Sequence, residues 1–178
     1  YRTSLFGKTH LHPHSGDLRD REYLMKTYGL DDVDEIGGPR ASMRVLSHMT
    51  AWWSDAGMWD RYKADFEERF EEKSHTVRPS PLGMEYYADV YVGQRAKHYI
   101  YNYDLNQPWC CWVSFGGPHE PWDAPEPYAS MYDPQRMPAP RAVPISVVGR
   151  PSGGFDNKLA QGAELMEEDI GAMRANYA

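Results

Sequence analysis

The chain has 178 residues, of which 41% are hydrophobic and 13% aromatic, so it can form the core of about one domain. Its formal net charge of −7 disfavours a general nucleic-acid-binding protein, because affinity for the phosphate backbone needs clustered Lys and Arg. The sequence contains no apolar run of membrane-spanning length and no signal-peptide pattern. We therefore expect no nucleic-acid partner and no membrane segment.

The first residues predict a strand that leads into a cationic motif. Residues 1–6 are typical of a strand already under way, and Gly7 allows the backbone to turn after it. Lys8 and His10 follow two positions apart, so in an extended segment their side chains project to the same side. Such a pair can bind a tetrahedral oxyanion and move protons around it.

His10, His12 and His14 form an alternating trio that offers two interpretations. Three histidines on one side of a segment could bind Zn or Cu. Against this, Pro13 interrupts the strand, and no carboxylate or cysteine lies close in sequence, so we predict no metal ligands in this segment. His12 and His14 are candidate substrate contacts, with hydrogen bonding within the loop as the favoured alternative.

Residues 59–73 predict an exposed amphipathic helix. Its apolar stripe consists of Trp59, Tyr62, Phe66 and Phe70. Charged residues, Arg69 among them, cover the other faces, and we interpret this charge run as solvated surface rather than as a binding site.

A second helix is expected over residues 86–101, followed by a strand over residues 109–115. The strand is nearly continuously apolar, which is typical of a strand covered on both faces. Its adjacent Cys110 and Cys111 point to opposite faces, so we predict buried thiols without a bridge. A helix followed by a buried strand favours an α/β sheet with helices on both faces.

The strand leads into a second motif and a long loop. His119 lies in the motif Pro118-His119-Glu120-Pro121-Trp122, and the next forty residues are rich in Pro and Gly. Loops of this length are typically functional or disordered, and the interspersed large side chains favour a packed loop: Trp122, Tyr128, Met131 and Tyr132. Beyond it, spacings of three and four from Leu159 to Tyr177 predict a helix that is still running where the chain stops. Both ends therefore look cut.

Ligands of open α/β sheets bind beyond the carboxyl ends of the strands, where Lys8, His10 and His119 are all expected. Two simpler motifs fail. A P-loop needs Gly where Arg2 stands, and a zinc-protease helix needs a second histidine where Asp123 stands. We therefore expect the two motifs to converge into one anion-handling site.

The order and spacing of these segments resemble the central part of a type I sulfatase. The resemblance is carried by residues 7–11, the helix 86–101, the strand 109–115, and residues 118–122, 125–128, 131–134 and 137–138. It implies an alkaline-phosphatase-like α/β fold, with residues 1–178 forming the central part of one catalytic domain that is truncated at both ends. It also implies hydrolysis of sulfuric esters by a formylglycine beside a bound calcium ion.

The resemblance also implies residue roles. Lys8 would contact the sulfate oxygens, and His10 would lie beside the formylglycine and accept the proton that triggers sulfate release. His119 would bind the sulfate near its bridging oxygen and assist the departing alcohol. The substrate would be a small-molecule or carbohydrate sulfate ester, and Trp122 is a candidate for stacking on a sugar ring, although packing of the loop is the favoured role for this side chain.

Other parts of the family pattern are missing from the sequence. The nucleophile signature does not occur, and neither Cys110 nor Cys111 matches it. The only adjacent aspartates in the first half, Asp31 and Asp32, follow Lys8 instead of preceding it, and we interpret them as a turn or helix cap. We therefore expect the formylglycine and the Ca²⁺ ligands outside this chain, and the isolated segment to be inactive.

Two other functions fit the same residues. A phosphodiester or phosphonate monoester hydrolase of the same superfamily would use a Lys/His oxyanion site equally well. A non-catalytic anion-binding relative would keep Lys8 and His119 without a nucleophile.

Overall fold

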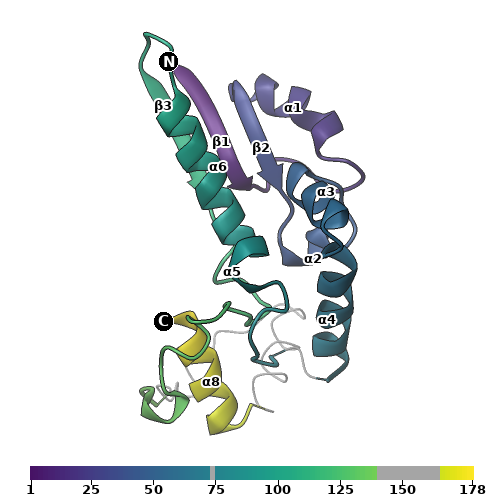
Figure 1. The fold of residues 1–178 in the computed structure, drawn as a ribbon, viewed down its shortest axis with the longest axis vertical. Helices are drawn as coiled ribbons and strands as arrows, with labels where there is room; N and C mark the ends of the chain where they lie inside the picture. Colours follow the sequence, from purple (N-terminus) through teal and green to yellow (C-terminus); the bar gives the residue numbers. More distant parts are fainter. Residues whose placement is uncertain (73–74, 140–164) are drawn as a thin grey trace, which may run out of the picture.

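A three-stranded parallel sheet organises the chain (Figure 1). The computed structural model describes residues 1–72, 75–139 and 165–178. In chain order the elements are β1 (Arg2–Lys8), η1 (Arg19–Arg21), α1 (Glu22–Thr27), β2 (Asp32–Ile36), α2 (Pro39–Ser42), α3 (His48–Asp55), α4 (Trp59–Glu72), α5 (Gly83–Tyr86), α6 (Ala88–Asn102), β3 (Trp109–Ser114), η2 (Pro134–Arg136) and α8 (Glu167–Tyr177). The strand order β2-β1-β3 makes the first strand the central one. The class is therefore α/β, as predicted.

The close approach of β1 to β3 depends on Gly7. This residue has φ of 119° and lies opposite Ser114 in the register of the two strands. A Cβ atom added to Gly7 would lie 1.8 Å from the Ser114 carbonyl oxygen. Only glycine allows both this backbone conformation and this strand spacing.

One face of the sheet is covered by α6 and α3. Phe6 of β1 and Ile36 of β2 lie in a buried cluster with residues of α3, α4 and α6 and with one residue that precedes α5, namely Met49, Trp53, Tyr62, Phe66, Val92, Ala96 and Leu82. Cys111 and Val113 of β3 pack against the same cluster. Because side chains alternate along a strand, these positions define the face towards α6.

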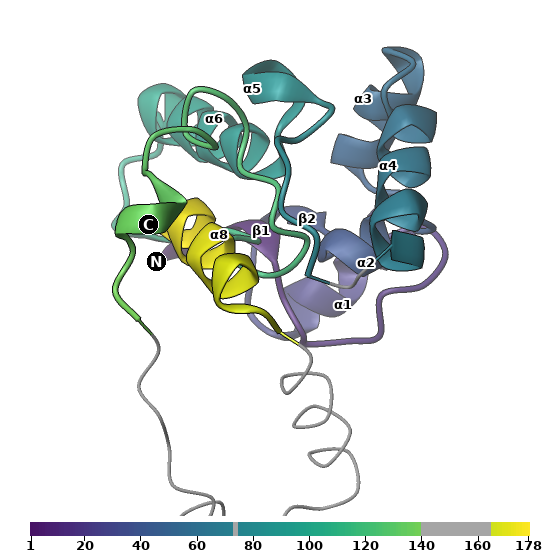
Figure 2. The same cartoon turned by 90° about the horizontal axis from the view of Figure 1, so that it is seen from below.

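The opposite face is only partly covered. Figure 2 shows α1 on the other side of the sheet from α6, and α1 contacts β2. Leu5 of β1 is fully buried on this face, but Trp112 of β3 is 45% exposed and Cys110 is exposed. The prediction that this strand is covered on both faces, with buried thiols, is therefore wrong for Cys110. Both cysteines are free, as predicted.

Strand β2 was not predicted from the sequence. Asp32 begins this strand, and its carboxylate accepts hydrogen bonds from Arg2 of β1 at 2.5 and 2.8 Å. Asp31 accepts a hydrogen bond from the Thr3 amide at 2.9 Å. The interpretation as a turn or helix cap is corrected for Asp32, which begins a strand that pairs with β1, whereas Asp31 lies in the bend that precedes this strand.

Helix α4 confirms the predicted amphipathic helix, with one correction. The side chain of Arg69 is only 2% exposed and forms an ion pair with Asp65 at 2.6 Å. Its guanidinium donates hydrogen bonds to the backbone carbonyls of Arg78 and Pro79 at 2.9 and 3.0 Å. The charge run is therefore not all solvated surface, because Arg69 ties α4 to the segment that follows it.

The other expected helices form with shifted boundaries. The one predicted over residues 86–101 is divided at Tyr87, whose extended backbone separates α5 from α6. The C-terminal helix, α8, begins after Met166, and the earlier positions of its predicted pattern, Leu159 and Ala163, lie outside the described residues.

Helix α8 lies beyond the carboxyl ends of the strands (Figure 1). No helix in the described ranges is long and apolar enough to cross a membrane.

The loop after β3 is less packed than the sequence predicts. Tyr128, Met131 and Tyr132 are 50%, 52% and 42% exposed, so they do not form a buried loop core. Trp122 is half-buried. The part of the predicted loop beyond residue 139 lies outside the described residues.

Candidate active site

The site is built at the carboxyl edge of the parallel sheet. Lys8 ends β1 and pairs in register with Ile36, the last residue of β2. Ser114 ends β3 and leads into the loop that carries His119. Because the three strands are parallel, these residues and the loops that follow them lie at the same edge.

Lys8 lies against the backbone of Gly38, two residues beyond β2. A Cβ atom added to Gly38 would lie 2.8 Å from Cε and 3.0 Å from Nζ of Lys8. The lysine side chain therefore occupies space that any other residue at position 38 would take. The glycine places the ammonium group at the sheet edge.

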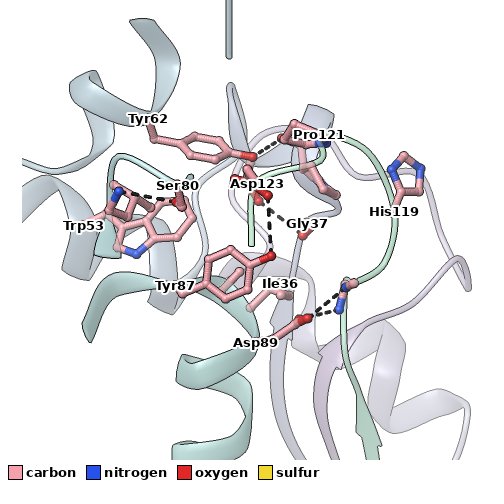
Figure 3. A pocket seen from close by; sticks show the side chains of 16 residues that line it. Ile36, Gly37, Trp53, Tyr62, Ser80, Tyr87, Asp89, His119, Pro121 and Asp123 are labelled. Atoms are coloured by element: carbon pink, nitrogen blue, oxygen red, sulfur yellow. Dashed lines mark hydrogen bonds between the residues drawn. The ribbon is translucent and has the colours of Figure 1, made fainter. Parts of the chain in front are cut away.

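His119 lies at the rim of a pocket that follows the ends of β2 and β3 (Figure 3). Its ring Nδ1 lies 2.7 Å from the carbonyl oxygen of Glu120. Since a carbonyl can only accept, Nδ1 carries the hydrogen and Nε2 is the nitrogen left for other contacts. The Glu120 carboxylate is 3.4 Å from the same Nδ1 and 3.7 Å from Arg40.

Asp89 fixes the backbone that leads to His119. Its carboxylate accepts hydrogen bonds from the amides of Gly116 and Gly117 at 2.6 and 3.0 Å (Figure 3). A Cβ on Gly117 would lie 2.6 Å from this carboxylate. Asp89 was not predicted as a site residue from the sequence, although the glycine pair at the end of a predicted strand is a signal for such a close contact.

Asp123 lies inside the same pocket and was also missed. It is 7% exposed, and burial raises the pKa of its carboxyl group to about 7. The Tyr87 hydroxyl points at it, with an oxygen–oxygen distance of 3.5 Å (Figure 3). A carboxyl group that is partly protonated near neutral pH can donate or accept a proton, so Asp123 adds an ionisable group to the pocket.

His12 and His14 turn inward to meet Glu35 of β2. Their Nε2 atoms lie 2.7 and 3.1 Å from the two oxygens of the Glu35 carboxylate, and the Thr9 hydroxyl donates a short hydrogen bond to the same group. Burial opposes ionisation of Glu35, but the hydrogen bonds from His14, Thr9 and His12 outweigh it and lower the pKa of this carboxyl group. These bonds join the histidines to strand β2, and His12 also has a contact within the loop, to the Pro13 carbonyl. Contact of either histidine with a substrate stays a prediction.

His10 and Trp122 occupy different surroundings. His10 is exposed, and its ring lies parallel to that of His14 with centroids 6.2 Å apart. The Trp122 carbonyl accepts a hydrogen bond from the Arg78 amide at 3.3 Å, and Trp122 borders a second hollow with His119 and the end of α8.

The pocket that contains Asp123 is lined by His119 but not by Lys8 or His10. This pocket therefore joins Asp123 to the second motif and not to the first.

The described residues do not fit the implied calcium ion or formylglycine. Ca²⁺ takes oxygen ligands. The one group of three or more His, Cys, Asp or Glu side chains that can share an ion, within the described ranges, is His12, His14 and Glu35, and two of its three donors are nitrogens. Cys110 and Cys111 lie within β3 and do not line the pocket at its end, so neither is placed as a formylglycine precursor.

No protein-family model matches this chain. Among solved structures, it is similar to the phosphonate monoester hydrolase SpPMH from Silicibacter pomeroyi, with 21% sequence identity and a TM-score of 0.44. The match covers 99% of this chain and 37% of that enzyme. This chain therefore spans little more than a third of the length of that enzyme.

Proposed function

We propose that this chain supplies the anion-binding and proton-transfer part of a sulfuric ester hydrolase of the alkaline phosphatase superfamily. The observation that supports this proposal is the position of Lys8 and His119 at the carboxyl ends of two neighbouring parallel strands. The motifs around both residues resemble those of type I sulfatases. The nucleophile and the calcium ligands of the proposed enzyme belong to residues outside the chain.

Lys8 has the chemistry to bind the sulfate group. Its ammonium group is held at the sheet edge against Gly38, where it can contact the non-bridging oxygens of a bound sulfate ester. A fixed cation stabilises negative charge that increases in the transition state more than it stabilises the ground state. Lys8 is therefore proposed as the anion-binding residue.

His119 has the geometry of a general acid. The carbonyl of Glu120 holds the hydrogen on Nδ1, and the Glu120 carboxylate stabilises the protonated ring. Nε2 can then donate its proton to the bridging oxygen as the sulfur–oxygen bond breaks, so the alcohol leaves uncharged. His10, which is exposed near the end of β1, is proposed as the second proton-transfer residue.

The substrate proposed for this site is a small-molecule or carbohydrate sulfate ester. Trp122 and His119 both line the second hollow, and Trp122 is half-buried. An indole face can stack on the apolar face of a sugar ring.

The test uses the whole protein that contains this chain, with p-nitrophenyl sulfate as substrate. Lys8→Ala and His119→Ala should each lower kcat/KM by about 10²- to 10⁴-fold, the usual size of one acid–base or oxyanion contact. Lys97→Ala and His98→Ala change the same residue types on the exposed surface of α6 and should leave the rate unchanged.

Two outcomes would contradict the proposal. Unchanged turnover in either site variant would remove that residue from the reaction. The second outcome is that the unmodified protein hydrolyses p-nitrophenyl phenylphosphonate faster than the sulfate ester, while Lys8→Ala and His119→Ala lower kcat/KM for the phosphonate as well. This result would retain the oxyanion site and reject the sulfate substrate.

A further inference from the structure

His12, His14 and Glu35 form a compact set of ligand atoms between the end of β1 and strand β2. One ligand atom from each side chain lies within 4.8 Å of the others. The side chains of His12, His14 and Glu35 are 4%, 8% and 2% exposed, so all three are withdrawn from solvent. Buried groups of this kind require partners that balance their charge and hydrogen bonds.

The ring of His12 shows what kind of partner is required. Its Nδ1 lies 3.2 Å from the Pro13 carbonyl oxygen, which can only accept, so Nδ1 carries a hydrogen. A neutral ring then has a lone pair on Nε2, and this atom faces a Glu35 oxygen at 2.7 Å. Two acceptors do not approach this closely unpaired, so a proton on Nε2 joins them when no ion is bound, and a metal ion bound to both atoms would replace that proton.

The surroundings match those of a metal-binding histidine. Such residues usually donate their second ring N–H to a backbone carbonyl or a carboxylate, which fixes the ring with the other nitrogen towards the metal. His12 and Pro13 have this relationship. The carboxylate is oriented as well, because the buried Thr9 hydroxyl donates a hydrogen bond to Glu35. The fold also removes the objection from the sequence, because it brings a carboxylate 21 and 23 residues away to His14 and His12.

We propose that His12, His14 and Glu35 bind a divalent transition-metal ion, with Zn²⁺ the best match. Two imidazole nitrogens and one carboxylate oxygen are typical Zn²⁺ donors, and a fourth, tetrahedral position is left for water. The ion would fasten the loop after β1 to strand β2, next to the segment that ends in Lys8. This inference does not depend on the sulfate substrate proposed above.

The test measures metal binding to the chain after treatment with a chelator. Zn²⁺ added to the unmodified chain should bind with one-to-one stoichiometry by titration calorimetry and should raise the melting temperature, because an ion that binds only the folded state stabilises it. Co²⁺ should give the intense visible d–d absorption of a four-coordinate site with nitrogen and oxygen ligands.

Variants separate the ligands from their surroundings. Glu35→Gln and His14→Ala should abolish both signals, and Thr9→Val should weaken Zn²⁺ binding by about 10- to 100-fold, the usual effect of losing a group that orients a ligand. His98→Ala removes an exposed histidine of α6 and should bind as the unmodified chain does.

The proposal is overturned if the unmodified chain shows no rise in melting temperature with Zn²⁺ and no Co²⁺ absorption, since a proton then bridges His12 and Glu35. It is also overturned if Glu35→Gln binds Zn²⁺ as tightly as the unmodified chain. The first result needs no variant, so the test stands even if a substitution prevents folding.

Discussion

Asp123 is a buried carboxyl group whose ionisation should make the stability of the fold depend on pH. Burial is the main cause that raises its pKa from 3.8 to about 7. The positive charge of Arg69 and the hydrogen bond from Tyr87 act in the opposite direction, whereas the negative charges of Asp65 and Asp89 raise the pKa further. The folded state therefore favours the neutral form of Asp123.

The sign of the effect follows from the order of ionisation. As the pH rises above about 4, the carboxyl group ionises in the unfolded chain but stays protonated in the folded one, so the free energy of unfolding falls until about pH 7. The shift of about 3 pKa units corresponds to about 4 kcal/mol at 1.36 kcal/mol per unit. Below about pH 4 both states bind the proton and the penalty is absent.

Asp123→Asn keeps the shape of the side chain and removes its ionisation. Urea unfolding followed by tryptophan fluorescence should show the variant to be more stable than the unmodified chain at about pH 8, by up to about 4 kcal/mol, with the difference vanishing near about pH 4. The exposed Asp104→Asn serves as control and should show no such trend. A difference between the Asp123 variant and the unmodified chain that stays constant over this pH range would refute the reasoning.

Three further substitutions test the packing around the site. Gly7→Ala places a methyl group 1.8 Å from a β3 carbonyl oxygen and should cost at least about 3 kcal/mol of stability in thermal melts, whereas Gly16→Ala, also at positive φ but in open space, should cost about 1–2 kcal/mol. Arg69→Leu leaves buried carbonyls unpaired and should cost about 3–5 kcal/mol of stability, whereas the exposed Arg61→Leu should change stability little. Equal losses of stability in the two variants would contradict the burial of the Arg69 guanidinium. Gly38→Ala displaces only a flexible lysine side chain, so it should raise KM for the sulfate ester in the whole protein with less than about 1 kcal/mol change in stability; an unchanged KM would show that the lysine does not bind the substrate there.

The elements that the sequence predicts well are those with a strong local pattern. The apolar spacing from Trp59 to Phe70 predicts α4, and the apolar run that ends in Ser114 predicts β3. Strand β2 has no such pattern, because it contains buried Asp34 and Glu35. Asp34 is accommodated by Arg95 of α6, which pairs with it at 2.6 Å, and contacts of this kind are invisible in the local sequence.

The candidate site follows the same division. Strand order and the ends of apolar runs are enough to place Lys8 and His119 at one sheet edge. The meeting of His12 with Glu35 depends on the register of β1 and β2, and no local pattern predicts that register. In the sequence Asp123 only breaks a zinc-protease motif, because its burial depends on how the loop after β3 folds at the pocket.

The central claim is that His119 donates a proton to the leaving alcohol at this sheet edge. The most direct measurement compares His119→Ala with the unmodified whole protein on two sulfate esters, an alkyl sulfate with a poor leaving group and p-nitrophenyl sulfate with a good one. We expect a loss of about 10²- to 10⁴-fold in kcat/KM for the alkyl ester and a much smaller loss for the aryl ester, because nitrophenolate needs little protonation. Equal losses on both esters, or no loss on the alkyl ester, would contradict it.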